Sequence, residues 1–192
     1  VAAALTPLFS RLIGDRVGYV GAVVAATSFG LVLTQVGREG TVSASWIPTL
    51  DVAFRFHVDG LALLFGLLAS GIGVLIFAYA TTYMHGMDNL GRFYMALLAF
   101  MGSILGVAFA ADLIVLFLFW ELTSLSSFLL IGFWSHRSDA RKGARMALTV
   151  TGAGGLALLA GLLLLGNIAG SFDLNVVLAS GDAILADPRY PV

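Results

Sequence analysis

One carboxylate, Glu121, lies inside a long apolar run, Asp112–Trp134, whose sequence is DLIVLFLFWELTSLSSFLLIGFW. The run has the length of about 20 residues that a helix needs to cross a bilayer. A charged side chain at the bilayer centre costs about 2.5–3.5 kcal/mol on insertion scales. A segment that only had to remain in the membrane would carry Leu at this position. We therefore interpret Glu121 as a site that handles an ion or a proton.

Hydroxyl side chains accompany this carboxylate along the same segment. Thr123, Ser124 and Ser127 follow Glu121 within two turns of a helix, and hydroxyl groups of this kind can line a file of water. A helix that starts near Leu113 would place Glu121 about 12 Å along its axis, close to the bilayer midplane. We predict that Glu121 handles protons and that the three hydroxyls are candidates for a polar path.

A proton-handling carboxylate needs a partner that changes the relative stability of its charged and neutral forms. An apolar environment disfavours the charged form, and a nearby Lys or Arg favours it. No other apolar run of this chain carries a cation at similar depth. The partner must then come from a helix outside this sequence or from another subunit, unless Glu121 stays protonated or water reaches it. A neutral Glu121 that only packs two helices together is the alternative.

The composition indicates an integral membrane protein. The 192 residues are 59% hydrophobic and 11% charged, against about 25% charged in a soluble domain, and the mean hydropathy is +0.99. There are no cysteines, and the three histidines are scattered without metal-ligand spacing. No nucleophile–base pair, metal set or phosphate loop is found either. We predict a secondary transporter rather than an enzyme, with no cofactor, no metal site and no role in nucleic-acid binding.

The apolar runs predict an all-α, polytopic transmembrane bundle with a short extracytoplasmic β-hairpin. Residues 41–58 predict the hairpin, because apolar and polar residues alternate from Val52 to Val58, and Asp59 is expected to cap the helix that follows. Residues 171–192 predict an amphipathic segment on the extracytoplasmic surface, with Leu174, Val177 and Leu178 as its apolar stripe. We treat the chain as a piece of a longer protein. The predicted bundle covers residues 1–170, with a partial first helix at 1–10 and spans at about 18–36, 61–83, 93–110, 113–134 and 146–166.

The distribution of Lys and Arg predicts the orientation. With the loops on alternate sides, one side holds Arg38, Arg55 and Arg189, and the other side holds the remaining seven basic residues. Cytoplasmic loops carry the excess of Lys and Arg. The basic turn 135–145 is therefore predicted to lie in the cytoplasm. The protein itself is predicted to lie in the inner membrane of a bacterial cell. The seven are Arg11, Arg16, Arg92, Arg137, Arg141, Lys142 and Arg145.

Three segments resemble the large antiporter-like subunits shared by Mrp-type Na⁺/H⁺ antiporters, membrane-bound hydrogenases and respiratory complex I. They are HVDGLALLFGLLASGIG at 57–73, the stretch 83–113 beginning YMHGMDNLGRFYM, and FLFWELTSLSSFLLIGFW at 117–134. The last of these, together with the Gly-rich ARMALTVTGAGGLALLAGLLLL at 144–165, is most similar to the A subunit of Mrp antiporters. The complex I homologue typically has an acidic residue where this chain has Gly152–Gly155.

The resemblance implies a many-helix fold built from inverted repeats, in a subunit that works within a hetero-oligomeric complex. It also implies exchange of Na⁺ for H⁺, with Glu121 at the position of the family's key glutamate and its lysine partner in a later helix. The expected partners are the rest of the same subunit, other membrane subunits and the bilayer. Two alternatives remain: a proton-pumping subunit of a complex I-type oxidoreductase or hydrogenase, and a structural membrane bundle that transports nothing.

Overall fold

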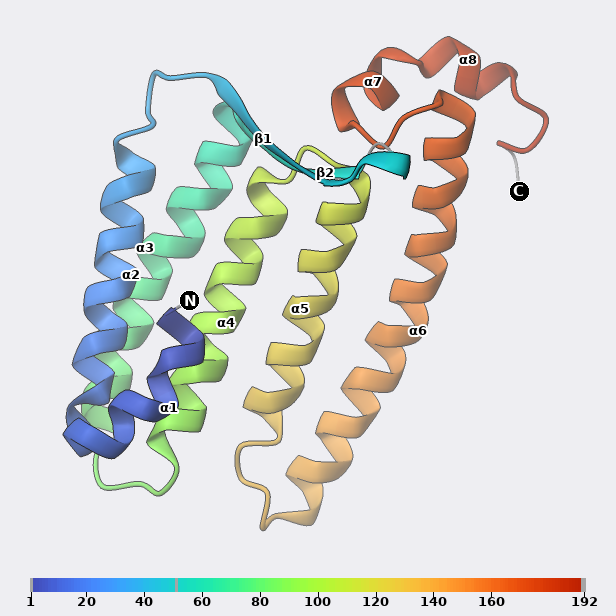
Figure 1. Cartoon of the computed structure of the whole chain (residues 1–192). Helices are drawn as coiled ribbons and strands as arrows, with labels where there is room; N and C mark the ends of the chain where they lie inside the picture. Colours follow the sequence, from blue (N-terminus) through green and yellow to red (C-terminus); the bar gives the residue numbers. More distant parts are fainter. Residues whose placement is uncertain (1, 51, 191–192) are drawn as a thin grey trace.

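The computed structural model describes residues 2–50 and 52–190 and shows a bundle of upright helices capped at one end by a β-hairpin (Figure 1). Val1, Asp51, Pro191 and Val192 belong to the predicted first helix, hairpin turn and terminal segment, and they lie outside the described residues. The helices are α1 (Ala2–Ile13), α2 (Val17–Leu33), α3 (Gly60–Tyr83), α4 (Leu90–Phe109), α5 (Leu113–Ile131), α6 (Ser138–Ala169), α7 (Leu174–Ala179) and α8 (Gly181–Ala186), and the strands are β1 (Gly40–Ile47) and β2 (Val52–Val58).

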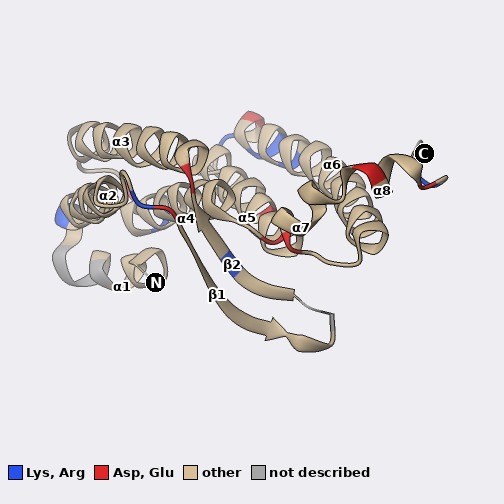
Figure 2. Ribbon diagram, turned by 90° about the horizontal axis from the view of Figure 1, so that it is seen from above, with Lys and Arg blue, Asp and Glu red and all other residues tan. Residues whose placement is uncertain are grey.

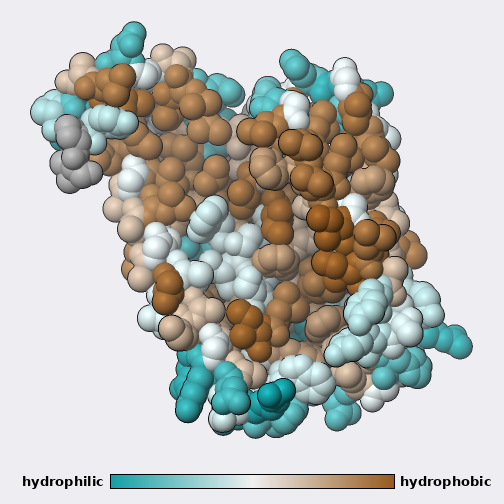
Figure 3. All heavy atoms as spheres, turned by 180° about the vertical axis from the view of Figure 1, so that it is seen from behind, coloured by the Kyte–Doolittle hydropathy of each residue, from teal (hydrophilic) through white to brown (hydrophobic). Residues whose placement is uncertain are grey.

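Four helices, α3 to α6, are long and apolar enough to cross a membrane. The apolar helix α2 has 17 residues and ends at Leu33, short of the predicted limit at 36, because the chain turns there and Gly37 adopts a φ of +77°. Figure 3 shows one flank of the molecule, where apolar residues predominate around a paler patch near the middle and the most hydrophilic residues gather at both ends. The predicted helical membrane bundle with a two-stranded antiparallel hairpin is confirmed at this level.

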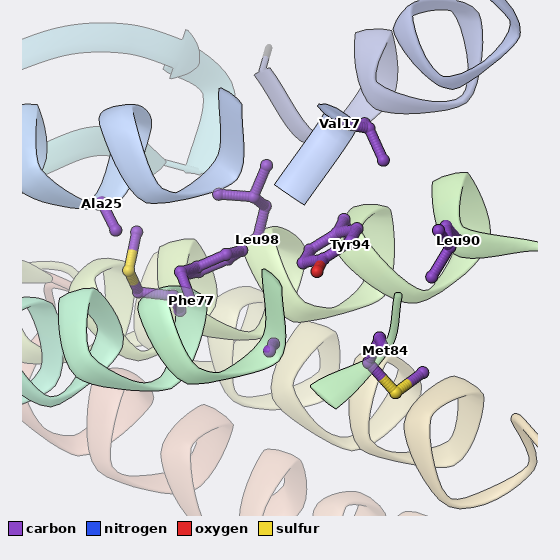
Figure 4. Packing of buried hydrophobic residues seen from close by; sticks show 9 residues of the cluster. Val17, Ala25, Phe77, Met84, Leu90, Tyr94 and Leu98 are labelled. Carbon is purple, nitrogen blue, oxygen red and sulfur yellow. The ribbon is translucent and has the colours of Figure 1, made fainter. Parts of the chain in front are cut away.

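The helices pack in sequence order, α2 against α3, then α4, α5 and α6, while α1 packs against α4. A buried cluster joins α2, α3 and α4, and its largest members are Phe77 and Tyr94, whose rings stack with centroids 6.1 Å apart (Figure 4). Helix α2 approaches this pair through Gly21, where a Cβ atom would lie 2.7 Å from the Phe77 ring. Small residues at such contacts let membrane helices come close together.

Helix α6 is longer than its predicted span, 146–166. It begins at Ser138, so most of the predicted basic turn 135–145 is helical, and the turn itself is short. The correction has a simple cause: Ala, Arg and Lys are good helix formers, and polarity alone does not make a loop. The first eight residues of α6 add about 12 Å of polar helix to the end of the apolar part.

The hairpin, the α4–α5 link and the C-terminal segment all lie at one end of the bundle, opposite the α5–α6 turn (Figure 1). In the hairpin, Gly40 pairs with Val58 and Thr41 with His57. As predicted, Asp59 caps α3, because its carboxylate accepts a hydrogen bond from the Ala62 N–H at 2.7 Å.

The C-terminal segment forms two short helices that pack on the bundle. Val177 and Ile184 are buried in a cluster with Leu113 of α5 and Leu162 of α6. Of the predicted apolar stripe, Leu174 joins this cluster too, whereas Leu178 is 72% exposed. The segment expected on the membrane surface is therefore packed on the protein along one side. Helix α7 ends just before Ser180 and α8 begins just after it, and both helices contact α6.

Candidate functional site

Glu121 lies near the middle of α5, with its carboxyl group against α6. The carboxyl oxygen Oε1 is buried and has no hydrogen-bond partner among the described residues. Its neighbour on α6 is Gly155, where an added Cβ atom would collide with Oε1. The two helices can enclose the carboxyl group at this point because Gly155 carries no side chain.

The three predicted hydroxyl residues lie together in a groove between α5 and α6. The groove has a volume of about 490 Å³, and Thr123, Ser124 and Ser127 line it from α5. Helix α6 adds a fourth hydroxyl, Thr151, which the sequence reasoning missed because it considered hydroxyls of one helix only. The apolar walls are Leu116, Trp120, Ala147, Gly154 and Leu158.

Two of these hydroxyls are anchored to their own helices. The Thr123 hydroxyl donates to the carbonyl oxygen of Trp120 at 2.6 Å, and the Thr151 hydroxyl donates to that of Ala147 at 2.8 Å. Their oxygens keep lone pairs that can accept a further hydrogen bond from water or from a cation's donor groups. Ser126 points elsewhere: its buried hydroxyl is satisfied by the carbonyls of Leu122 and Thr123.

Glu121 lies beside the groove rather than in its lining, on the face of α5 that meets Gly155. The adjacent residue of α6, Gly154, does line the groove. Among the side chains that the structure describes, no Lys or Arg forms an ion pair with Glu121.

A charged junction that the sequence reasoning did not predict holds the end of α5. Asp112, the N-cap residue of α5, is completely buried and accepts hydrogen bonds from the N–H groups of Ile114 (3.0 Å) and Val115 (3.3 Å). Its other oxygen accepts from the Arg55 guanidinium at 3.0 Å and from the Ala53 N–H at 3.2 Å. The Arg55 Nε atom also lies 3.5 Å from Asp173, so one guanidinium joins β2 to the starts of α5 and α7. In Figure 2, a basic segment of β2 is blue, and the acidic segments beside the labels of α5 and α7 are red.

Backbone hydrogen bonds reinforce this junction. The Ala111 N–H donates to the carbonyl of Arg55, and the Leu113 N–H donates to that of Phe172, both at 2.9 Å. The Leu174 N–H in turn donates to the carbonyl of Ala111 at 2.9 Å. The hairpin, the α4–α5 link and the C-terminal segment thus form one hydrogen-bonded layer that fixes the upper end of the helix carrying Glu121.

Two family models match this chain. Residues 46–94 match the model described as NADH-ubiquinone oxidoreductase (complex I), chain 5 N-terminus. Residues 110–184 match the model described as NADH:quinone oxidoreductase/Mrp antiporter, TM. The second match contains Glu121, the groove and the docked C-terminal segment as far as residue 184.

Several curated proteins are similar in sequence. A probable K⁺/H⁺ antiporter A/B subunit of Rhizobium meliloti is 54% identical over 145 residues, which is 76% of this chain and 14% of that protein. A putative antiporter subunit mnhA2 of Staphylococcus epidermidis is 38% identical over 183 residues, or 94% of this chain and 23% of that protein. A Na⁺/H⁺ antiporter A1 subunit of Staphylococcus haemolyticus is 41% identical and covers 82% of this chain and 20% of that protein.

Two solved structures share the fold. The Mrp complex from Dietzia sp. DQ12-45-1b superposes on 98% of this chain with a TM-score of 0.87 and 33% identity, over 20% of its own matched chain. An archaeal membrane-bound sulfane sulfur reductase superposes on 91% with a TM-score of 0.76 and 17% identity, over 27% of its chain, which shows likeness of fold. This chain thus spans between 14% and 27% of the length of these proteins. It belongs to the family of antiporter-like membrane subunits that complex I and Mrp antiporters share.

Proposed function

We propose that the chain is part of the A subunit of an Mrp-type antiporter, in which the inward flow of protons drives the efflux of a monovalent cation. The observation that carries the proposal is the carboxyl oxygen of Glu121, which is buried near the middle of a membrane helix without a hydrogen-bond partner among the described residues. Burying such a group costs free energy that a purely structural helix would avoid. Glu121 is the group that would accept and release the proton.

The charge of Glu121 would be controlled by a lysine from a helix outside residues 1–192. An approaching cation stabilises the carboxylate and releases its proton, and a retreating cation lets the proton return. The hydroxyls of Thr123, Ser124, Ser127 and Thr151 would supply the polar lining along which water and protons reach the carboxyl group. The proposal includes the other membrane subunits of the complex as partners.

The proposal places the protein in the bacterial cell membrane, with the hairpin outside and the basic start of α6 in the cytoplasm. The hairpin lies at the opposite end of the bundle from the start of α6, which carries the exposed cations Arg141, Lys142 and Arg145, as this orientation requires. The exchanged cation is Na⁺ in the proposal. The named relatives include both K⁺/H⁺ and Na⁺/H⁺ antiporter subunits, so transport assays should compare both ions.

The test is Glu121→Gln in the complete complex, assayed for cation-dependent proton movement in membrane vesicles with Na⁺, K⁺ and Li⁺ in turn. The amide has nearly the same size but cannot release a proton, so we expect exchange to fall by about two orders of magnitude or more. Glu39→Gln is the matched control, because Glu39 is exposed in the link before β1. Exchange at the wild-type rate in Glu121→Gln would refute the proposal.

The family models also name NADH:quinone oxidoreductase, so a redox-driven pump is the second candidate. Purification of the native complex separates the two: iron–sulfur proteins in stoichiometric amounts favour the pump, and small membrane subunits alone favour the antiporter. A third possibility is a structural bundle that itself transports nothing. In that case Glu121→Leu would leave exchange by the complete complex intact and would raise the melting temperature, because removal of the carboxylate would remove only its burial cost.

A further inference from the structure

Gly155 differs from the neighbouring glycines of α6 in what an added side chain would meet. At Gly152, Gly154 and Gly161, no heavy atom lies within 4 Å of an added Cβ. At Gly155 an added Cβ would run into Oε1 of Glu121 and lie 2.9 Å from its carboxyl carbon. One missing side chain on α6 thus provides the space that the acid occupies.

We propose that Gly155 is a positioning residue for Glu121: the absence of a side chain at 155 forms a seat in which the carboxyl group rests, covered by α6 and separated from the hydroxyl groove. Any side chain at 155 fills the seat and displaces the carboxyl group. The consequence for transport rests on the proposed proton-handling role of Glu121, but the seat itself does not.

The displaced group is the side chain of Glu121 and not the helix backbone. The atoms that a Cβ at 155 would meet are the far end of a flexible side chain, Oε1, Cδ and Oε2. The carboxyl group can move by rotation about its own bonds while α5 and α6 stay in place. Replacement of Gly by Ala also favours the helical backbone of α6. Gly155→Ala should therefore leave the helix bundle assembled and relocate one functional group.

The position of the carboxyl group can be measured without transport. Dicyclohexylcarbodiimide is an apolar reagent that modifies protonated carboxyl groups inside membranes, and Glu121→Gln gives the background. In the full complex, we expect Gly155→Ala to raise the labelling rate of Glu121 about tenfold, because the covered oxygen becomes accessible. Gly152→Ala and Gly161→Ala are matched controls that should label as the wild type does, because neither position contacts Glu121 or lines the groove. Wild-type labelling in Gly155→Ala would overturn the seat.

Cation/proton exchange, measured in membrane vesicles that contain the same variant complexes, gives the functional readout. A displacement of about 1 Å at a reacting group can cost about a hundredfold in rate, so we expect Gly155→Ala to slow exchange roughly ten- to hundredfold with normal amounts of complex. The Gly152→Ala and Gly161→Ala controls, which lie outside the groove lining, should exchange normally. General loosening of the bundle would lower the amount of assembled complex. Faster labelling and slower exchange with a normal amount of complex therefore indicate a displaced carboxyl group.

A double variant tests the contact itself. Glu121→Asp shortens the side chain by one methylene and withdraws the carboxyl group from the seat, so adding Gly155→Ala to it should cause no further loss of exchange. Losses that multiply would overturn the proposal. If Gly155→Ala alone prevented assembly, the shorter acid should restore it, and continued failure to assemble would also overturn the seat. Wild-type exchange in Glu121→Gln would instead refute the proposed function. The contact between Gly155 and Glu121 would then be tested by the labelling rates alone.

Discussion

The guanidinium of Arg55 donates a hydrogen bond to the carboxylate of Asp112 at 3.0 Å, although 57 positions separate the two residues in the chain. Asp112 is inaccessible to solvent, and it also accepts from the backbone N–H groups of Ile114 and Val115 in α5 and of Ala53 in β2. A buried carboxylate is tolerated when a cation and hydrogen-bond donors surround it. This pair therefore ties the hairpin to the membrane helix that carries Glu121.

Loss of Asp112 should destabilise the protein more than loss of its charge alone. Asp112→Ala leaves Arg55 without its buried partner and removes the cap of α5, and breaking such a pair typically costs about 3–5 kcal/mol. Asp112→Asn keeps an oxygen for the N–H groups of Ile114 and Val115 and should cost less. Thermal unfolding of the complex in lipid nanodiscs measures both. Equal melting temperatures for the wild type and Asp112→Ala would contradict the assigned role.

Two glycines of α4 should respond differently to the same substitution. The pair Gly102 and Gly106 reads as one small-residue motif in the sequence, but a Cβ atom at Gly102 would meet nothing within 4 Å. A Cβ atom at Gly106 would collide with the ring of Phe119 on α5. Gly106→Ala should therefore lower stability by about 1–3 kcal/mol, as overpacking does.

The control for that prediction is Gly102→Ala, which should leave the melting temperature unchanged or raise it slightly through helix propensity. A comparable loss in both variants would show that the helices do not approach each other as described.

Removal of the Asp59 cap should weaken the start of α3. The Asp59 carboxylate satisfies the N–H group of Ala62 at 2.7 Å, and loss of an N-cap costs about 0.5–2 kcal/mol. Asp59→Ala should therefore increase hydrogen exchange of the first turn of α3, whereas Asp59→Ser should restore most of the protection. Mass-spectrometric hydrogen exchange over residues 59–64 gives the measurement. Unchanged protection in Asp59→Ala would show that the cap contributes nothing.

The pair Asp187 and Arg189 should titrate abnormally at the C-terminal end. Hydrogen bonds from the Arg189 side chain and backbone N–H lower the pKa of Asp187 from 3.8 to about 2. The stabilising charge interaction is thus complete above pH 3.8 and is lost as the pH falls through about 2. The carboxyl carbon of Asp187, followed by NMR, should show its midpoint near 2 in the wild type. Arg189→Ala should return it toward 3.8, and a midpoint near 3.8 in the wild type would contradict the pairing.

The membrane character, the hairpin and the cap of α3 could be predicted from local sequence because each has a local cause. Apolar runs of spanning length must enter lipid, a period of two over Val52–Val58 forms a strand, and Asp59 before an apolar run caps a helix. The helix limits were less predictable where polar residues remain helical, as at the start of α6. Tertiary packing also decided the fate of the C-terminal segment, whose Val177 and Ile184 find apolar neighbours on α5 and α6.

The amino-acid sequence by itself determined that a carboxylate would lie deep in a membrane helix with hydroxyls on the same helix, since both follow from residue order and the rise of about 1.5 Å per residue. Only the tertiary structure decided what faces these groups. Gly155 against Glu121, Thr151 across the groove and Arg55 against Asp112 each bring together residues that lie far apart in the chain. Such contacts depend on how whole helices and the hairpin pack, and no local pattern of the chain encodes the distance between them.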